Sequence, residues 1–111
     1  MDNRVYSMAE ISEIVAPIAR KYGLPAIFLF GSYARGTPTP ASDLDFLVDT
    51  TGTGLTSLLK LGALYADLEA AFDKPIDLIT VSSIHQPAQL PSDVQFKKAV
   101  WKEKVSIYDA A

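Results

Sequence analysis

The chain has no cysteine, only one histidine, and no long hydrophobic run. Without cysteine there can be no disulfide, thiolate metal ligand or cysteine nucleophile, so any chemistry must come from oxygen atoms, amines or the ring of His85. No window approaches the roughly 20 apolar residues that a membrane-spanning helix needs, and residues 1–6 do not resemble the start of a signal peptide. We therefore expect a cytoplasmic protein that does not enter a membrane.

Positive charge is also scarce, because 10 Lys and Arg residues stand against 13 Asp and Glu, which gives a net charge of −3. Sequence-independent binding to a phosphate backbone depends on Lys and Arg, so a long nucleic acid is a poor candidate ligand. Lys97, Lys98, Lys102 and Lys104 nevertheless fall within one short stretch. This cluster predicts either a solvated helix face or a basic spot for an acidic partner.

A length of 111 residues with 49% hydrophobic content suits one globular domain and leaves no room for a second. We expect a single domain over residues 1–111. The sequence leaves open whether it forms homo-oligomers or hetero-oligomers.

Apolar periodicity predicts alternating helices and strands. Ser7 and Glu10 have the form of a capping box, Gly23 suits the C-terminal cap, and Pro17 should remove one backbone hydrogen bond within this helix. The expected helices are 7–22, 55–72 and 92–101, the strands are 26–30, 43–49, 76–81 and 104–108, and 31–36, 37–42 and 82–91 are turns or loops. This order predicts an α+β (mixed α/β) fold, in which helices pack on one small mixed sheet.

The patterns also predict burial. Strand 26–30 is continuously apolar, as in a strand buried on both faces, whereas strand 43–49 alternates at its start like a strand with one wet face. Leu58 and Leu59 fit the apolar stripe of the second long helix. Ser92 is the expected cap of the last helix. Trp101 and Tyr108 are expected to be packing residues. His85 is expected to be a surface loop residue, because residues 83–89 offer no partner for a ligand set or a catalytic triad.

Carboxylates interrupt the apolar runs at three positions. Asp43 and Asp45 are two residues apart on one expected strand, so their side chains leave the same face about 7 Å apart. Such a pair is costly at the edge of a core, and Mg²⁺ removes that cost because it binds one or two carboxylates together with substrate phosphates. Asp77 would complete a three-carboxylate site if its strand is the neighbour, which the sequence leaves open.

Gly31 and Ser32 provide a feature suited to phosphate. A glycine directly after a buried strand lets the backbone turn so that N–H groups face an anion, and Ser32 adds a hydroxyl donor. Arg35 could reach the same anion, although a surface arginine paired with Asp49 or another carboxylate would have the same sequence pattern. Anion donors and metal ligands together are the minimum for nucleotidyl or phosphoryl transfer.

Each feature has an ordinary structural interpretation as well. Gly31 and Ser32 can be a plain strand-to-helix turn, Asp43 and Asp45 a polar strand end, and Asp77 a solvent-facing strand residue. Gly31, Ser32, Asp43 and Asp45 occur together at this spacing. Their joint occurrence favours one functional site over these separate structural interpretations.

The spacing also carries a family resemblance. Gly31-Ser32, ten further residues and then Asp43-Leu44-Asp45 resemble the G-S-x10-D-x-D signature of the DNA polymerase beta-like nucleotidyltransferase superfamily. The strings GSYARG, SDLDFLVD and PIDLIT resemble its minimal nucleotidyltransferase (MNT) branch, and the similarity runs from KYGLPAIFLF to VSIYDA.

The resemblance implies a polymerase beta palm-like fold and an ATP-dependent nucleotidyltransferase of the protein adenylyltransferase type. It implies that Asp43 and Asp45 bind Mg²⁺, and that Gly31 and Ser32 hold the triphosphate. It further implies that Asp77 is the third carboxylate and the base toward the incoming hydroxyl.

MNT proteins commonly act as antitoxins of HEPN ribonuclease toxins, by transferring AMP to a toxin tyrosine or by contact. The resemblance therefore implies a HEPN toxin as partner. The chain lacks the second domain with which aminoglycoside nucleotidyltransferases and poly(A) polymerases present their acceptors, so the acceptor should be small or come with another protein. Two alternatives remain open: a binding module that acts by contact alone, and a nucleotidyltransferase acting on RNA or a small molecule.

Overall fold

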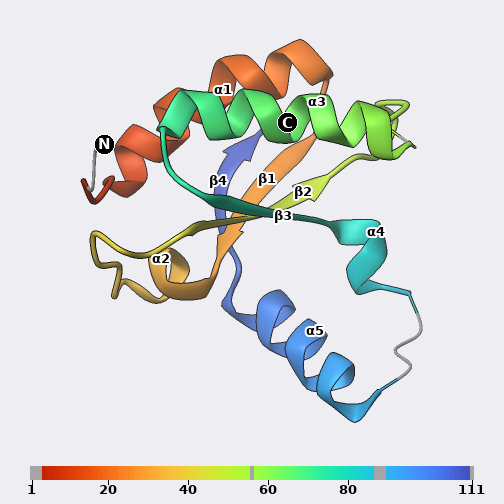
Figure 1. Cartoon of the computed structure of the whole chain (residues 1–111). Helices are drawn as coiled ribbons and strands as arrows, with labels where there is room; N and C mark the ends of the chain where they lie inside the picture. The colour runs from red at the N-terminus through yellow and green to blue at the C-terminus, as the bar shows by residue number, and fades with distance from the viewer. Residues whose placement is uncertain (1–3, 56, 87–89, 111) are drawn as a thin grey trace.

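A four-stranded mixed sheet forms the centre of the computed structural model, which describes residues 4–55, 57–86 and 90–110 (Figure 1). The strands are β1 (Ala26–Phe30), β2 (Leu44–Asp49), β3 (Ile76–Thr80) and β4 (Val105–Asp109), in the order β3-β2-β1-β4. β1 pairs antiparallel with both β2 and β4, whereas β2 and β3 run parallel. The predicted α+β fold with a mixed sheet is therefore confirmed.

Helices cover both faces of this sheet. They are α1 (Met8–Tyr22), α2 (Gly31–Arg35), α3 (Leu58–Phe72), α4 (Val81–Ile84) and α5 (Pro91–Glu103). α1 and α3 lie side by side over one face, while α4 and α5 lie toward the other (Figure 1). Two cores result: a large one under α1 and α3, and a small one of Phe30, Leu47, Ile84 and Val100. None of the helices described combines the length and apolar character needed to cross a membrane.

The ends of α1 are as predicted. Ser7 accepts a hydrogen bond from the backbone of Glu10 while the Glu10 side chain accepts one from Ser7, which completes the capping box. Gly23 ends the helix with a left-handed backbone at φ 68°. The helix continues through Pro17. Local sequence chemistry therefore defines α1 without help from the rest of the fold.

The expected wet face of β2 is wrong at Leu47. Leu47 lies on the same face as Asp45, yet its side chain is fully buried in the small core. The reason is that α4 and α5 cover this part of the sheet, which the pattern of β2 alone does not reveal.

The apolar stripe assigned to the second long helix is wrong at its start. α3 begins at Leu58 after a Ser57 cap, and Leu58 and Leu59 are 89% and 86% exposed. The residues of α3 that enter the core are Leu64, Leu68 and Phe72. Leu58 and Leu59 stand on the first turn, where no neighbouring element covers them.

Replacing both exposed leucines should hardly affect folding. We expect Leu58→Ser/Leu59→Ser to change the free energy of unfolding by no more than about 0.5 kcal/mol, because surface substitutions remove little buried area. Leu64→Ala, a truncation in the core, should cost about 2–5 kcal/mol. Urea unfolding of the three proteins measures both effects, and a loss above 1 kcal/mol in the double variant would contradict the exposure seen here.

Smaller corrections concern the C-terminal half. α5 begins with Pro91 directly after Leu90, so Ser92 lies inside the helix instead of capping it. α4 begins at Val81, the last residue of the expected strand 76–81, and continues into the expected loop 82–91, of which 87–89 lie outside the described residues. Tyr108 packs against the large core as predicted, but Trp101 is 40% exposed.

Candidate functional site

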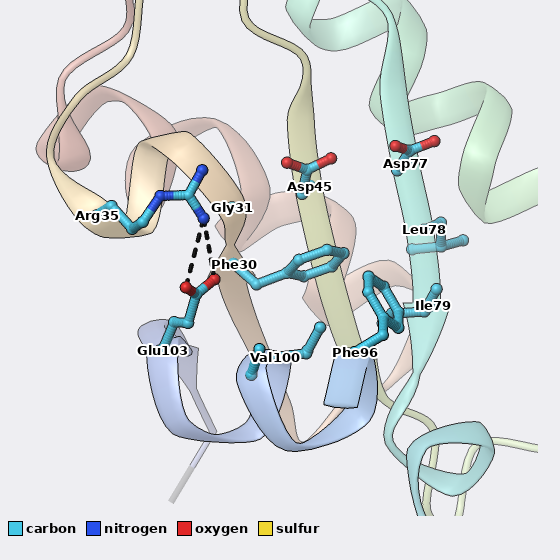
Figure 2. Close-up of a pocket in the computed structure, with 11 residues that line it drawn as sticks. Phe30, Gly31, Arg35, Asp45, Asp77, Leu78, Ile79, Phe96, Val100 and Glu103 are labelled. Carbon is cyan, nitrogen blue, oxygen red and sulfur yellow. Dashed lines mark hydrogen bonds and ion pairs between the residues drawn. The ribbon is translucent and has the colours of Figure 1, made fainter. Parts of the chain in front are cut away.

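Three of the predicted site residues, Gly31, Asp45 and Asp77, meet where β1 ends. Phe30 on β1 pairs with Asp45 on β2, and Asp45 pairs in turn with Asp77 on the parallel strand β3. The strand adjacency that the sequence left open is therefore present. Figure 2 shows the carboxyl groups of Asp45 and Asp77 side by side on neighbouring strands.

Gly31 lies directly against the Asp45 carboxyl group. Its backbone has φ +73°, which favours glycine, and a Cβ added there would overlap Asp45 Oδ2 and lie 3.1 Å from Asp45 Cγ. Two independent requirements, a left-handed backbone and a close approach, thus coincide at Gly31. The turn into α2 is pressed against the carboxylate on which the proposed chemistry depends.

An open cavity of about 450 Å³ lies beside these residues. This volume is within the range of small-molecule sites. Its polar lining comes from α2, β2, β3 and the end of α5, and its apolar lining from the sheet and α5 (Figure 2). The lining residues are Phe30, Gly31, Arg35, Asp45, Asp77, Leu78, Ile79, Phe96, Ala99, Val100 and Glu103.

Positive charge near Asp45 does not balance the carboxylates around it. The pKa of Asp45 is raised to about 6, first by burial and then by the neighbouring carboxylates of Asp77 and Asp43, while Arg35 opposes the rise. Without a bound cation, ionisation of Asp45 therefore costs more free energy in the folded chain than in the unfolded chain. A bound cation would offset both the burial and the repulsion, so these oxygen ligands fit a hard divalent ion such as Mg²⁺.

Asp43 stands apart from the pair. It is exposed, lies one residue before β2, and is not among the residues that line the cavity. Within 4–55, 57–86 and 90–110 no three His, Cys, Asp or Glu side chains form a ready-made metal site. The trio of Asp43, Asp45 and Asp77 as metal ligands therefore remains a prediction.

A buried lysine fixes the loop that leads to Asp43. Lys74 is only 6% exposed. Its Nζ donates to the carbonyl of Pro40 at 3.0 Å and to that of Arg4 at 3.3 Å. The next residue, Pro75, accepts a hydrogen bond from the backbone N–H of Leu44 at 3.2 Å. The link between α3 and β3 thus holds both sides of the segment that carries Asp43.

Arg35 reaches the cavity and forms an ion pair within it. Its Nη1 lies 3.2 Å and 3.3 Å from the two carboxyl oxygens of Glu103 on α5 (Figure 2). The alternative partner named from the sequence, Asp49, instead accepts a hydrogen bond from the backbone N–H of Thr51. Because the Arg35 side chain is about half exposed, the pair contributes little stability and leaves the guanidinium available to an anion.

Ser32 lies in the first turn of α2 and is partly buried, but it does not line the cavity. The residue that precedes α2 is Phe30, which offers no side-chain cap to the first N–H groups of the helix. The turn therefore keeps backbone donors for an outside acceptor. Phosphate binding by Gly31, Ser32 and Arg35 remains a prediction.

The apolar wall contributed by α5 was missing from the sequence interpretation. Phe96, Val100 and Glu103 come from a helix that reads as an ordinary amphipathic segment. By contrast, Phe30, Leu78 and Ile79 stand next to Gly31 or Asp77 in the chain, so proximity to the motifs could have indicated them. No comparable signal exists for α5.

His85 is an exposed turn residue, as predicted, and its ring contacts an aromatic neighbour. It follows α4 as its C-terminal cap, and its ring centroid lies 4.8 Å from that of Trp101. This pair lies outside the lining of the cavity beside Asp45.

A small mixed sheet with helices on both faces, a glycine turn and acidic residues on two neighbouring strands define a nucleotidyltransferase. The chain belongs to the nucleotidyltransferase domain family, whose model matches residues 11–108. It is 42% identical over 76 residues to the Methanocaldococcus jannaschii protein named "Putative protein adenylyltransferase MJ0435", covering 68% of this chain and 80% of the relative.

Solved structures agree on the fold. A crystal structure of a toxin-antitoxin with AMP-PNP superposes with a TM-score of 0.66 and 22% identity, covering 89% of this chain and 73% of that one. A structure of tri-AMPylated Shewanella oneidensis HEPN toxin in complex with MNT antitoxin gives a TM-score of 0.64 and 19% identity, covering 93% and 73%.

Proposed function

We propose that this nucleotidyltransferase transfers AMP from ATP to a hydroxyl group of a partner protein in an Mg²⁺-dependent reaction. The observation that carries the proposal is the position of Asp45, which lies against the Gly31 turn and in register with Asp77. Anion donors and carboxylates thus border one cavity, as nucleotidyl transfer requires.

In this proposal Asp43, Asp45 and Asp77 hold Mg²⁺, and the backbone of Gly31 together with Ser32 and Arg35 binds the triphosphate. The bound cation neutralises phosphate charge and activates the phosphorus toward attack. Arg35 adds a second positive charge and exchanges its contact with Glu103 for a phosphate oxygen. The apolar side of the cavity, including Phe96 and Val100, shields the nucleotide from water.

The transfer step is a displacement at the α-phosphorus of ATP. The acceptor oxygen forms a bond to that phosphorus, the bond to the β-phosphate oxygen breaks, and pyrophosphate leaves. Asp77 accepts the proton of the acceptor hydroxyl. Its side chain is exposed, so it can meet a hydroxyl that another molecule brings.

The partner proposed is a HEPN-type toxin, with this chain as its antitoxin, and the setting is cytoplasmic. The support is the similarity to relatives named as protein adenylyltransferases and the fold shared with the antitoxin of an AMPylated HEPN toxin. The net charge of −3 speaks against RNA as the acceptor, and an assay with tRNA tests that alternative.

Asp43→Asn is the direct test. With a HEPN partner, ATP and Mg²⁺, the unaltered protein should add the mass of AMP to its partner and release pyrophosphate. The variant should lose at least about 100-fold in rate, because a ligand to the charge-stabilising ion is gone, and keep its circular dichroism spectrum. Asp73→Asn is the control, since Asp73 has a left-handed backbone that asparagine tolerates. If the unaltered protein gives neither product, the enzymatic proposal fails.

A contact-only antitoxin is the second candidate, favoured by the exposed side chains of Leu58 and Leu59. Asp43→Asn/Asp45→Asn separates the two functions. Full neutralisation of the toxin by this double variant would support contact alone, whereas a variant that binds the toxin but does not neutralise it would exclude that mode.

A further inference from the structure

A second cavity lies on the opposite side of α5 from the catalytic one. Its volume is about 490 Å³, and α5 together with the end of α4 forms its walls. The lining residues are Ile84, His85, Lys97, Lys98, Trp101 and Lys102. α5 contributes different residues to the two cavities, so one helix separates them. We call the second one the Trp101 cavity.

The ring of Trp101 is held in place but not covered. The centroid of the His85 ring lies 4.8 Å away in an edge-on arrangement, and the Nζ of Lys104 lies 3.8 Å from the indole centroid. Lys104 Nζ also donates to the carbonyl of Trp101 at 3.0 Å. The indole is 40% exposed despite these contacts. A fixed, accessible aromatic surface is typical of residues that anchor a partner.

The cavity concentrates positive charge on an acidic protein. Lys97, Lys98 and Lys102 line it, and the chain as a whole has a net charge of −3. Lys97 is fixed because its Nζ donates to the carbonyl of Gln86 at 2.8 Å. These lysines attract an acidic ligand, and the rest of the surface repels one that extends far beyond the cavity.

We propose that the Trp101 cavity docks an acidic peptide segment of the acceptor protein, with an aromatic or apolar side chain against Trp101. Charge complementarity supports a peptide, since a short acidic segment ends before the acidic catalytic side. A longer phosphate backbone would continue onto it. The proposal rests on the proposed function for the identity of the acceptor, but not for the binding itself.

The position of the cavity suits an acceptor. A helix with its side chains is roughly 10–12 Å across, and an extended chain covers about 3.3 Å per residue. Half the circumference of such a helix is roughly 16–19 Å, so a hydroxyl roughly five or six residues away from the docked segment can reach around α5 to the catalytic cavity. Docking on one side of the helix would present the acceptor on the other.

Trp101 is the sole tryptophan of the chain, so its fluorescence reports on this cavity directly. The probe is a synthetic peptide of four glutamates around one phenylalanine, titrated into the full chain. We expect a saturable change in fluorescence that weakens several-fold at high salt, because ions screen exposed charges. Lys98→Glu/Lys102→Glu should weaken binding at least about tenfold, and ATP should still raise its melting temperature as in the unaltered protein.

The matched control is Arg20→Glu/Lys60→Glu, which changes the net charge equally at exposed sites away from the cavity. An equal loss of affinity in this control would show general charge attraction and overturn the proposal. Absence of any fluorescence change, or tighter binding of a uridine octamer than of the peptide, would overturn it too. Peptide binding without AMP transfer would instead refute only the enzymatic function.

Discussion

Gly31→Ala is expected to abolish nucleotide transfer while leaving a folded protein. The left-handed backbone of Gly31 makes alanine cost about 1–2 kcal/mol in the free energy of unfolding. The added Cβ would also overlap the Asp45 carboxyl oxygen, which sits at the end of a side chain and can rotate away. The Asp45 carboxyl group therefore moves while the fold is kept. We expect the rate of transfer to fall by at least about 100-fold.

Gly36→Ala provides a close control for this prediction. Gly36 has nearly the same backbone, with φ +76° against +73°, but a Cβ there meets nothing within 4 Å. Both variants should lose similar stability in urea unfolding, and only Gly31→Ala should lose pyrophosphate release and ATP binding. Equal activity in the two variants would mean that the position of the Asp45 carboxyl group does not matter.

Asp45→Asn should separate activity from stability. Transfer should fall by at least about 1,000-fold, because the variant loses a charge that the proposed site requires. Without metal and nucleotide at pH 7.5 the variant should nevertheless melt about 5 °C higher, because asparagine carries no charge that burial disfavours. ATP with Mg²⁺ should then stabilise the unaltered protein and have little effect on the variant.

The raised pKa of Asp45 explains why the Asp45→Asn variant should be more stable than the unaltered protein. Asp45 has a pKa of about 6 in the folded chain against 3.8 ordinarily, so between these values the folded state holds more protons than the unfolded state. Stability from this group is therefore present at low pH and is lost as the pH rises through about 6. Because Asp45 is only partly buried, solvent screens part of the effect, and we expect a penalty of about 1 kcal/mol.

The melting difference should accordingly shrink as the pH is lowered from 6 to 4, in buffer with a chelator. Asp49→Asn makes the same substitution on the same strand outside the cavity lining and should not melt higher than the unaltered protein at pH 7.5. A difference that stays constant over this pH range would contradict the raised pKa.

Local sequence signals predicted the main elements and three residues of the candidate site that lie together in the structure. Gly31, Asp45 and Asp77 were selected because glycine after a strand and carboxylates within apolar runs need a reason, and the structure brings these three together. The capping box at Ser7 defines α1 for a similar reason, since its hydrogen bonds join residues only three apart.

Features that depend on distant segments could not be read in the same way. Leu47 is buried by α4 and α5, and Leu58 is exposed because no element covers the start of α3, although both are leucines in amphipathic patterns. The ion pair of Arg35 with Glu103 joins residues far apart in the chain, and its sequence pattern allowed several carboxylate partners. These contacts depend on where α4 and α5 pack against the sheet.

The strand order has a consequence for which acceptors the enzyme can use. Asp77 lies on β3, the outermost strand of the sheet, and its side chain is exposed. In the proposed reaction the hydroxyl therefore approaches over the edge of the sheet, and the cavity need not enclose the acceptor. A folded macromolecule of any size can offer one residue at this border. In the proposed reaction, selectivity for the acceptor must then arise at the interface between the two proteins. The catalytic residues themselves can tolerate many different acceptors.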